Sequence, residues 1–192
     1  MEPLDRDLEQ RLESIVRGTP WLLRALDIVR SLRLPNWYLA AGSIRNTVWD
    51  ALHGLTSSEP ASDLDVIYFD AVKLNHGAEA ILRDAVPEYS WEVTNQANVH
   101  HWQSRAAARE IPAYGSISAA MASWPETATA VGVRLIDGET MEFIAPHGLA
   151  DLFSLIVRPS PFVADLDAYS SRLRQKAWHL RWPRLRVVPP KL

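Results

Sequence analysis

The chain contains no cysteine among its 192 residues. Disulfide scaffolds and thiolate chemistry are therefore excluded, and a zinc site would need histidines and carboxylates alone. Long apolar runs are also missing. Charged residues are spread through the amino-terminal MEPLDRDLEQRLESIV, and no later stretch approaches the roughly 20 uncharged residues of a membrane span. We therefore expect a cytoplasmic protein with no membrane partner.

Acidic residues are absent from the last part of the chain. After Asp167 there are seven basic residues and no acidic one, so residues 1–167 carry 13 basic and 23 acidic groups, a net charge of -10. A basic segment on an acidic body is compatible with an anion-binding element beside a metal site. A cationic helix end followed by a solvated tail is the alternative.

The pattern of apolar residues predicts an α+β protein. With 47% hydrophobic and 22% charged residues, the composition is that of an ordinary folded chain, and the length indicates one domain spanning 1–192. We expect a mixed β-sheet flanked by helices, with a pair of helices within 1–34 and a basic helical extension and tail over 163–192. Strands are expected at 37–41, 63–69, 89–95, 130–136 and 140–145, and helices at 8–16, 20–32, 44–52, 75–86, 100–109, 116–123, 147–156 and 164–179.

The first candidate site is the Asp63-Leu64-Asp65 segment at the start of a predicted strand. Side chains alternate along a strand, so the two carboxylates point to the same face, about 7 Å apart. Two like charges at that spacing are stabilised by a cation, and Mg²⁺ prefers oxygen ligands. The alternative is a pair of solvent-facing aspartates. Because the polar residues precede the apolar strand, an aspartyl-phosphate nucleophile is disfavoured.

The second candidate site is Gly42-Ser43, where a predicted strand passes directly into a helix. The amide groups and the positive end of the helix dipole meet at such a corner, and glycine allows a phosphate to approach the backbone closely. A simple strand-to-helix corner would have the same sequence. The case for phosphate binding comes from the combination with the paired carboxylates on the next strand.

Taken together, the blocks AAGSIRNTVWDALHG, DLDVIYFD and YSWEVTNQANVHHW resemble the nucleotidyltransferase superfamily of DNA polymerase beta type. With SWPETATAVGVRL and APHGLADLFSLIVRPSP, they are similar to a bacterial family of small nucleotidyltransferase-like proteins without a well-defined activity. The resemblance implies the nucleotidyltransferase fold. It also implies that Gly42 and Ser43 hold a triphosphate, that Asp63 and Asp65 bind Mg²⁺, and that Glu92 is the third carboxylate.

The residues around these motifs are compatible with that assignment. Glu92 lies in an apolar strand, where an inward carboxylate is costly unless it meets a metal ion or a hydrogen-bonding partner. Arg45, one turn into the helix after Gly42-Ser43, is a candidate phosphate ligand, with an exposed helix arginine as the alternative. Asn95, Gln96 and His100 are candidates for the acceptor side, with a capped turn as the alternative. Most of the eight tryptophans are expected in the core, although Trp178 and Trp182, among arginines, are candidates for stacking on a base.

We therefore expect a Mg²⁺-dependent nucleotidyltransferase, with Asp63, Asp65 and Glu92 as the catalytic and metal-binding residues and Gly42, Ser43 and Arg45 as the nucleotide-binding residues. The donor partner is an NTP, and the acceptor is a small molecule, a protein or RNA. Two alternatives stay open. One is a non-catalytic nucleotide-binding or regulatory protein of the same fold, and the other is an RNA-binding module that uses the basic tail, against which the pI near 6.1 argues.

Overall fold

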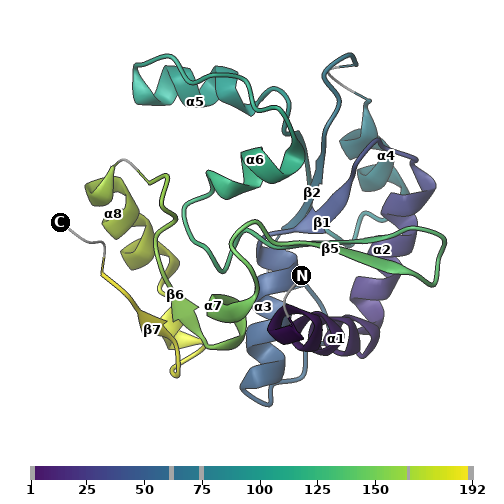
Figure 1. Cartoon of the computed structure of the whole chain (residues 1–192). Coiled ribbons are helices and arrows are strands. Elements are labelled where there is room, and N and C mark those ends of the chain that lie inside the picture. Colours follow the sequence, from purple (N-terminus) through teal and green to yellow (C-terminus); the bar gives the residue numbers. More distant parts are fainter. Residues whose placement is uncertain (1–2, 61–62, 74–75, 164, 190–192) are drawn as a thin grey trace.

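The computed structural model describes residues 3–60, 63–73, 76–163 and 165–189 (Figure 1). The helices are α1 (Pro3–Arg17), α2 (Pro20–Ser31), α3 (Gly42–Leu52), α4 (Ala78–Ala85), α5 (Val99–Ala107), α6 (Ile117–Ala122), α7 (Ala150–Phe153), α8 (Leu166–Lys176) and the 3₁₀ helix η1 (Trp178–Leu180). The strands are β1 (Tyr38–Ala40), β2 (Leu64–Tyr68), β3 (Trp91–Asn95), β4 (Gly132–Leu135), β5 (Met141–Ile144), β6 (Ile156–Val157) and β7 (Arg186–Val187). Among the described helices, none has the length and apolar character needed to cross a bilayer.

The main sheet is mixed, as the sequence predicts. Its strand order is β3-β2-β1-β4-β5. Strand β1 pairs antiparallel with β2 and with β4, and β4 pairs antiparallel with β5. Strands β2 and β3 are parallel, and α4 lies between them in the chain, because a parallel connection needs a crossover. Because β3 is the first strand in the order, it forms one edge of the sheet.

The two faces of the sheet have different coverings. Figure 1 shows α1, α2 and α3 packed beside the sheet, and the main hydrophobic cluster joins these helices to Leu39, Val66 and Val133. A smaller cluster on the other face joins Ala40 and Ile67 to α6. Since Asp65 alternates with Leu64 and Val66 along β2, its side chain lies on the face of the smaller cluster.

Helix α2 begins with Pro20 in its first turn, where the missing N–H costs nothing. Thr19 precedes it but does not cap the helix with its side chain. Its hydroxyl instead donates to the carbonyl of Ile15, at 2.9 Å, and so ties the end of α1 to the start of α2.

The carboxyl-terminal third is less helical than expected. The helix expected over 147–156 is limited to α7, and the chain then enters β6. The helix expected over 164–179 begins at a residue outside the described part, and α8 ends where Ala177 adopts a left-handed conformation with φ of 45°. Beyond η1, strand β7 pairs parallel with β6. This small sheet of two-residue strands has no periodic sequence pattern that could predict it.

Candidate functional site

Asp65 and Glu92 lie directly opposite one another in the sheet. The parallel pairing of β2 with β3 places Asp65 in register with Glu92, and the antiparallel pairing with β1 places Asp65 opposite Ala40. Residues in register point to the same face of a sheet. The predicted pair Asp63 and Asp65 is split by the start of the strand: β2 begins at Leu64, and Asp63 is exposed just before it.

Asp65 occupies an unfavourable environment for a negative charge. Its pKa is raised from 3.8 to about 6, first by burial and then by the charge of Glu92, with a smaller contribution from Asp63. A hydrogen bond from the backbone N–H of Gly42 and the positive charge of Arg45 act in the opposite direction. The three predicted carboxylates therefore interact electrostatically, and the strand-to-helix corner holds the most buried of them.

The corner at Gly42 has a strained backbone that the sequence does not reveal. Ala41, which precedes α3, has φ of 53° and ψ of -123°, a combination that glycine adopts far more readily than alanine. The hydroxyl of Ser43 donates to the carbonyl of Ala40 at 2.6 Å, and the N–H of Ala41 donates to the carbonyl of Val131 at 3.0 Å. Backbone strain of this kind is typical of functional sites, such as ligand-binding corners.

Glu92 is exposed, which differs from the inward orientation considered in the sequence analysis. The physical reason is that β3 is an edge strand, so a side chain on the face of Asp65 reaches solvent at the rim of the sheet. An exposed carboxylate needs no partner to offset desolvation. Its proximity to Asp65 therefore arises from the register of β2 and β3 rather than from a buried ion pair.

The carboxylates near Gly42 do not form a complete metal site by themselves. In the described part of the chain, no three or more His, Asp or Glu side chains gather closely enough to hold a metal ion by themselves. The donor chemistry is nonetheless that of Mg²⁺, which usually binds one or two protein carboxylates together with substrate phosphates. Burial and, after it, the charge of Glu92 raise the pKa of Asp65, so a cation at this point would offset both the desolvation and the repulsion. The residues therefore fit a Mg²⁺ ion that arrives with a triphosphate better than a Mg²⁺ ion alone.

Arg45 is buried, which neither alternative of the sequence analysis anticipated. It is 5% exposed, and burial lowers the pKa of its guanidinium to about 10. The guanidinium donates to the hydroxyl of Thr129 at 2.7 Å and to the side-chain oxygen of Asn46. It also lies over the ring of Trp178, with 4.3 Å between its central carbon and the ring centroid. The positive charge of Arg45 therefore lowers the pKa of Asp65 while its guanidinium stays buried.

Glu126 is a buried acidic residue whose role the sequence did not reveal. It is 1% exposed and accepts a bidentate pair of hydrogen bonds from Arg172, at 2.6 and 3.3 Å. The hydroxyl of Thr129 donates to Glu126 at 2.9 Å while accepting from Arg45. The signal in the sequence is an acidic residue inside the apolar stretch SWPETATAV, but its partner lies 46 positions further along the chain.

The basic carboxyl-terminal segment is docked on α3. Asp50, 1% exposed, accepts from Arg181 through both carboxylate oxygens, at 3.0 and 2.9 Å, and from the indole N–H of Trp182 at 2.8 Å. Trp178 and Trp182 both pack edge-on against Trp49 and are buried. They are therefore core residues, and the expectation that they stack on a base is wrong.

Of the candidates for the acceptor side, Asn95 forms the capped turn that the sequence analysis left open. Its side-chain oxygen accepts from the N–H groups of Asp70 and Ala97, both at 3.1 Å. Gln96 is 3% exposed, and its side-chain oxygen finds no donor in the described part of the chain. The Nδ1 atom of His100 is also buried and has no hydrogen-bond partner among the described residues.

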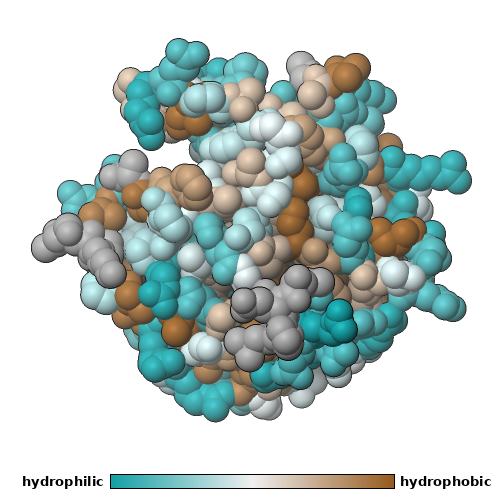
Figure 2. Space-filling view, viewed as in Figure 1, coloured by the Kyte–Doolittle hydropathy of each residue, from teal (hydrophilic) through white to brown (hydrophobic). Residues whose placement is uncertain are grey.

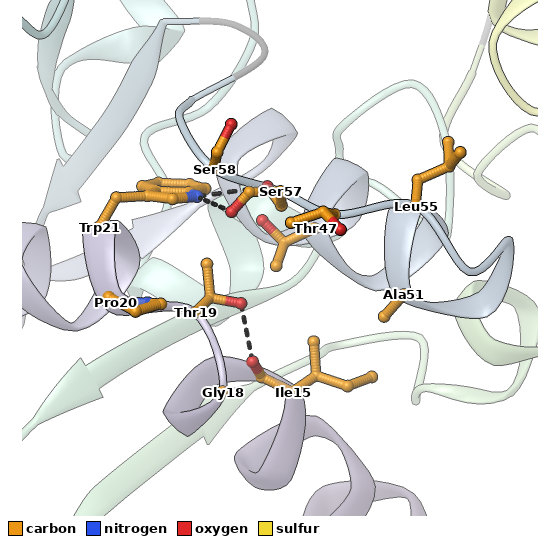
Figure 3. Close-up of a pocket in the computed structure, with 11 residues that line it drawn as sticks. Ile15, Gly18, Thr19, Pro20, Trp21, Thr47, Ala51, Leu55, Ser57 and Ser58 are labelled. Atoms are coloured by element: carbon orange, nitrogen blue, oxygen red, sulfur yellow. Dashed lines mark hydrogen bonds between the residues drawn. The ribbon is translucent and has the colours of Figure 1, made fainter.

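A separate cavity of about 500 Å³ lies where the α1–α2 junction meets α3 (Figure 3). The indole N–H of Trp21 donates to the carbonyl and hydroxyl oxygens of Ser57, at 3.1 and 3.2 Å, across its upper wall. Thr47 also lines the cavity, and its hydroxyl donates to the carbonyl of Ser43 at 2.7 Å. None of the predicted site residues lines this cavity, so the candidate site lies elsewhere.

Comparison with known proteins identifies the family. Residues 27–187 match a family model described as Nucleotidyltransferase. A solved structure described as "The NMR structure of the protein reveals a CCA-adding enzyme head domain" is 33% identical to this chain, with a TM-score of 0.80, and the match covers 94% of this chain and 96% of that one. No curated protein matches the chain significantly. The expected fold is confirmed by this similarity, and the chain belongs to the nucleotidyltransferase family.

Proposed function

We propose that this transferase moves a nucleoside monophosphate from an NTP to an acceptor in a Mg²⁺-dependent reaction at the face carrying Asp65. The observation that carries the proposal is the position of Asp65. It receives a hydrogen bond from the N–H of Gly42 on one side and lies in register with Glu92 on the other. The half-buried carboxylate of Asp65 thus lies next to both the predicted phosphate corner and the predicted third carboxylate, which supports the proposal.

The residues of the chain have distinct tasks in this proposal. The amino-terminal end of α3, starting at Gly42 and Ser43, orients the triphosphate through its backbone N–H groups and its dipole. Asp63 and Asp65, with Glu92, would hold Mg²⁺. When bound, the metal ion neutralises developing charge on the phosphates and aligns the reacting oxygens. Arg45 adds positive charge behind the corner without leaving the interior.

The chemistry is an in-line displacement. An oxygen of the acceptor forms a bond to the α-phosphorus, and the bond from that phosphorus to the bridging oxygen of pyrophosphate breaks. Pyrophosphate leaves with the electron pair of that bond. The proton of the acceptor hydroxyl passes to a base, for which the exposed Glu92 is available.

A non-catalytic nucleotide-binding protein remains the second candidate, and one observation favours it. The hydrogen bond between Gly42 and Asp65 occupies a backbone N–H that phosphate would otherwise use. In a binding protein this bond would persist. In an enzyme, the carboxylate of Asp65 would instead help to hold Mg²⁺, and the N–H of Gly42 would be available to a phosphate.

Release of pyrophosphate separates the two candidates. Purified protein is incubated with Mg²⁺ and each NTP in turn, first alone and then with cell extract as a source of acceptors. The proposal predicts pyrophosphate release that depends on Mg²⁺, on one or more NTPs and on the extract. Saturable NTP binding without any pyrophosphate release under all of these conditions would instead favour the binding protein.

A further inference from the structure

The corner between β1 and α3 has a different neighbour on each side. The strand order β2-β1-β4 places Asp65 of β2 on one side of β1 and β4 on the other. On the side of β4, the N–H of Ala41 donates to the carbonyl of Val131 at 3.0 Å. The segment that precedes β4 therefore lies against the corner, on the side away from Asp65.

This segment is tied to α8 by polar side chains. The hydroxyl of Thr129 accepts a hydrogen bond from Arg45, near the start of α3, and donates one to Glu126. Glu126 in turn pairs with Arg172 of α8 through bonds of 2.6 and 3.3 Å. In Figure 1, α8 lies across from α5 and α6, and Figure 2 shows the surface indented between the regions of α5 and α8. The middle of α8 is thus connected to the start of α3 beside this indentation.

The charged cluster of Arg45, Arg172 and Glu126 carries one positive charge in excess. The guanidinium carbons of Arg45 and Arg172 lie 4.3 and 6.0 Å from the centroid of the same indole ring, that of Trp178. Burial lowers the pKa of Arg45, and the charge of Arg172 lowers it further, against the charge of Glu126. The side chain of Arg172 is 33% exposed. An anion that reaches its exposed end would therefore offset the repulsion between the two cations.

Tyr169, one turn before Arg172 on α8, has a buried hydroxyl next to this cluster. The residue is 3% exposed, and its hydroxyl forms no hydrogen bond within the described part of the chain. Burial and the charge of Glu126 raise the pKa of Tyr169, whereas the charge of Arg172 lowers it, so both partners of the ion pair act on this hydroxyl. A buried donor without a partner is unfavourable, and a bound ligand is one explanation for such a group.

The cluster lies where the leaving group of an in-line displacement is expected. The attacking oxygen and the pyrophosphate are on opposite sides of the α-phosphorus. Glu92, the proposed base, belongs to β3, one strand beyond Asp65, whereas Arg172 is reached from the corner in the direction of β4. A triphosphate that runs from Asp65 across the amino-terminal end of α3 toward α8 would place its pyrophosphate away from the base.

We propose that Arg172 and Tyr169 of α8 form the subsite for the β- and γ-phosphates of the NTP, and for pyrophosphate after transfer. Arg172 keeps the 2.6 Å bond from Nε to Glu126 and turns its terminal nitrogens toward the phosphates, so the longer bond of 3.3 Å is released. The hydroxyl of Tyr169 then donates to Glu126 in place of that bond, and the buried carboxylate stays paired. This assignment rests on the proposed function and makes the carboxyl-terminal extension part of the donor site.

Inorganic triphosphate is the probe for this subsite, because it carries the phosphates of every NTP without a base. Binding of radiolabelled triphosphate in the presence of Mg²⁺ is measured by equilibrium dialysis, and stability without ligand is measured by urea unfolding. Wild-type protein is expected to bind the probe. Absence of binding at up to about 1 mM, the upper end of common substrate affinities, overturns the proposal.

Tyr169→Phe removes only the hydroxyl. Since this hydroxyl has no partner in the described part of the chain, the variant should unfold at the same urea concentration as wild type or a higher one. Triphosphate should nevertheless bind about 10-fold more weakly, as expected for loss of one hydrogen bond to a carboxylate. Wild-type affinity in Tyr169→Phe overturns the proposal and leaves the hydroxyl with a structural role.

Tyr114→Phe is the matched control for this variant. The hydroxyl of Tyr114 forms hydrogen bonds with Gln103 and Ser123, at 2.8 and 2.9 Å. Its removal should therefore lower stability and leave triphosphate affinity at the wild-type value, the reverse of the pattern expected for Tyr169→Phe. Weaker binding in both variants would show that affinity responds to any lost hydroxyl, which overturns the assignment of Tyr169.

Arg172→Lys keeps the positive charge but loses the planar fork that can bind a carboxylate and a phosphate at once. Triphosphate should bind about 10- to 100-fold more weakly. Arg181→Lys is the control, because Arg181 also forms two bonds to a buried carboxylate, that of Asp50, but near the other end of α3. It should bind triphosphate as wild type does, even where its stability falls. Equal weakening in both variants would mean that affinity follows the docking of the whole extension, which overturns the assignment of Arg172.

Failure of this proposal can be told apart from failure of the proposed function. If Tyr169→Phe and Arg172→Lys weaken triphosphate binding as expected but no NTP ever releases pyrophosphate, the subsite is supported and the transfer reaction fails. If pyrophosphate is released while both variants bind triphosphate as wild type does, the transfer reaction stands and the subsite is overturned.

Discussion

Asp65 lies opposite Glu92 in the parallel pairing of β2 and β3, and the backbone N–H of Gly42 donates a hydrogen bond to it from the start of α3. This relationship brings together three segments that are separate in the sequence. Asp65, whose pKa is raised to about 6, therefore lies at the junction of β2, β3 and α3.

Metal-free Asp65→Asn is expected to be more stable than wild type at neutral pH. The folded-state pKa of Asp65 is about 6, above the ordinary 3.8, so the folded protein binds more protons than the unfolded chain between these values. Stability of the wild type therefore falls as pH rises through this window. At about pH 8 the variant should gain about 1 to 3 kcal/mol, and the gain should shrink towards pH 4.

Urea unfolding in the presence of EDTA at several pH values measures this effect. Asp84→Asn, which removes an exposed carboxylate of α4, is the matched control. If Asp65→Asn is less stable than wild type at pH 8, Asp65 supports the fold by accepting hydrogen bonds, and its proposed role as a metal ligand loses its basis.

Mg²⁺ and NTP are expected to stabilise the protein together far more than either does alone. No described cluster of three metal-ligating side chains is present, so the phosphates must complete the ligand set. Ligands that bind only the folded state stabilise it by mass action. Thermal unfolding should therefore show a larger shift for the mixture than the sum of the separate shifts. An equal shift with Mg²⁺ alone would indicate a complete metal site within the protein.

Ala41→Gly should stabilise the fold. Ala41 has φ of 53° and ψ of -123°, where a Cβ atom is strained, and release of this strain should outweigh the added backbone entropy of glycine by about 1 kcal/mol. In the control Ala80→Gly, an exposed residue of α4 loses helix propensity, and stability should fall by about 0.5 to 1 kcal/mol. Loss of stability in both variants would mean that the corner is unstrained.

Glu126→Gln should destabilise the protein strongly. The change removes the carboxylate that pairs with Arg172 and attracts the buried charge of Arg45. Breaking a buried ion pair from one side costs about 3 to 5 kcal/mol, whereas an exposed pair contributes about 0 to 1 kcal/mol. Glu79→Gln, which breaks the exposed pair with Arg83, is the control. Equal midpoints of denaturant unfolding for the two variants would show that Glu126 does not hold the carboxyl-terminal segment in place.

Local patterns in the sequence predicted most of the fold. Short apolar runs bounded by turn residues predict the strands over 37–41 and 63–69, with the corner at Gly42-Ser43 between them, and the structure has β1, α3 and β2 there. The exposure of Glu92 could not be predicted in the same way. It depends on β3 being the edge of the sheet, which is a property of strand order rather than of the residues in β3.

The surroundings of the site required the three-dimensional structure. Arg45 looks like an ordinary helix residue in the sequence, but Thr129 and Trp178, far along the chain, enclose its guanidinium. The sequence shows seven basic residues after Asp167, and the structure pairs two of them, Arg172 and Arg181, with Glu126 and Asp50. Charge counts do not reveal partners that only tertiary contacts bring together.

The most direct test of the central claim is transfer of label from an NTP labelled at the α-phosphate, in the presence of Mg²⁺ and cell extract, by wild type, Asp65→Asn and Arg158→Gln. Arg158 pairs with Asp151 at the surface and serves as the control for a conservative charge change outside the candidate site. The account predicts that wild type and Arg158→Gln attach label to an acceptor and that Asp65→Asn, although folded, attaches essentially none. Label transfer by Asp65→Asn at the wild-type rate would contradict the assignment of the site.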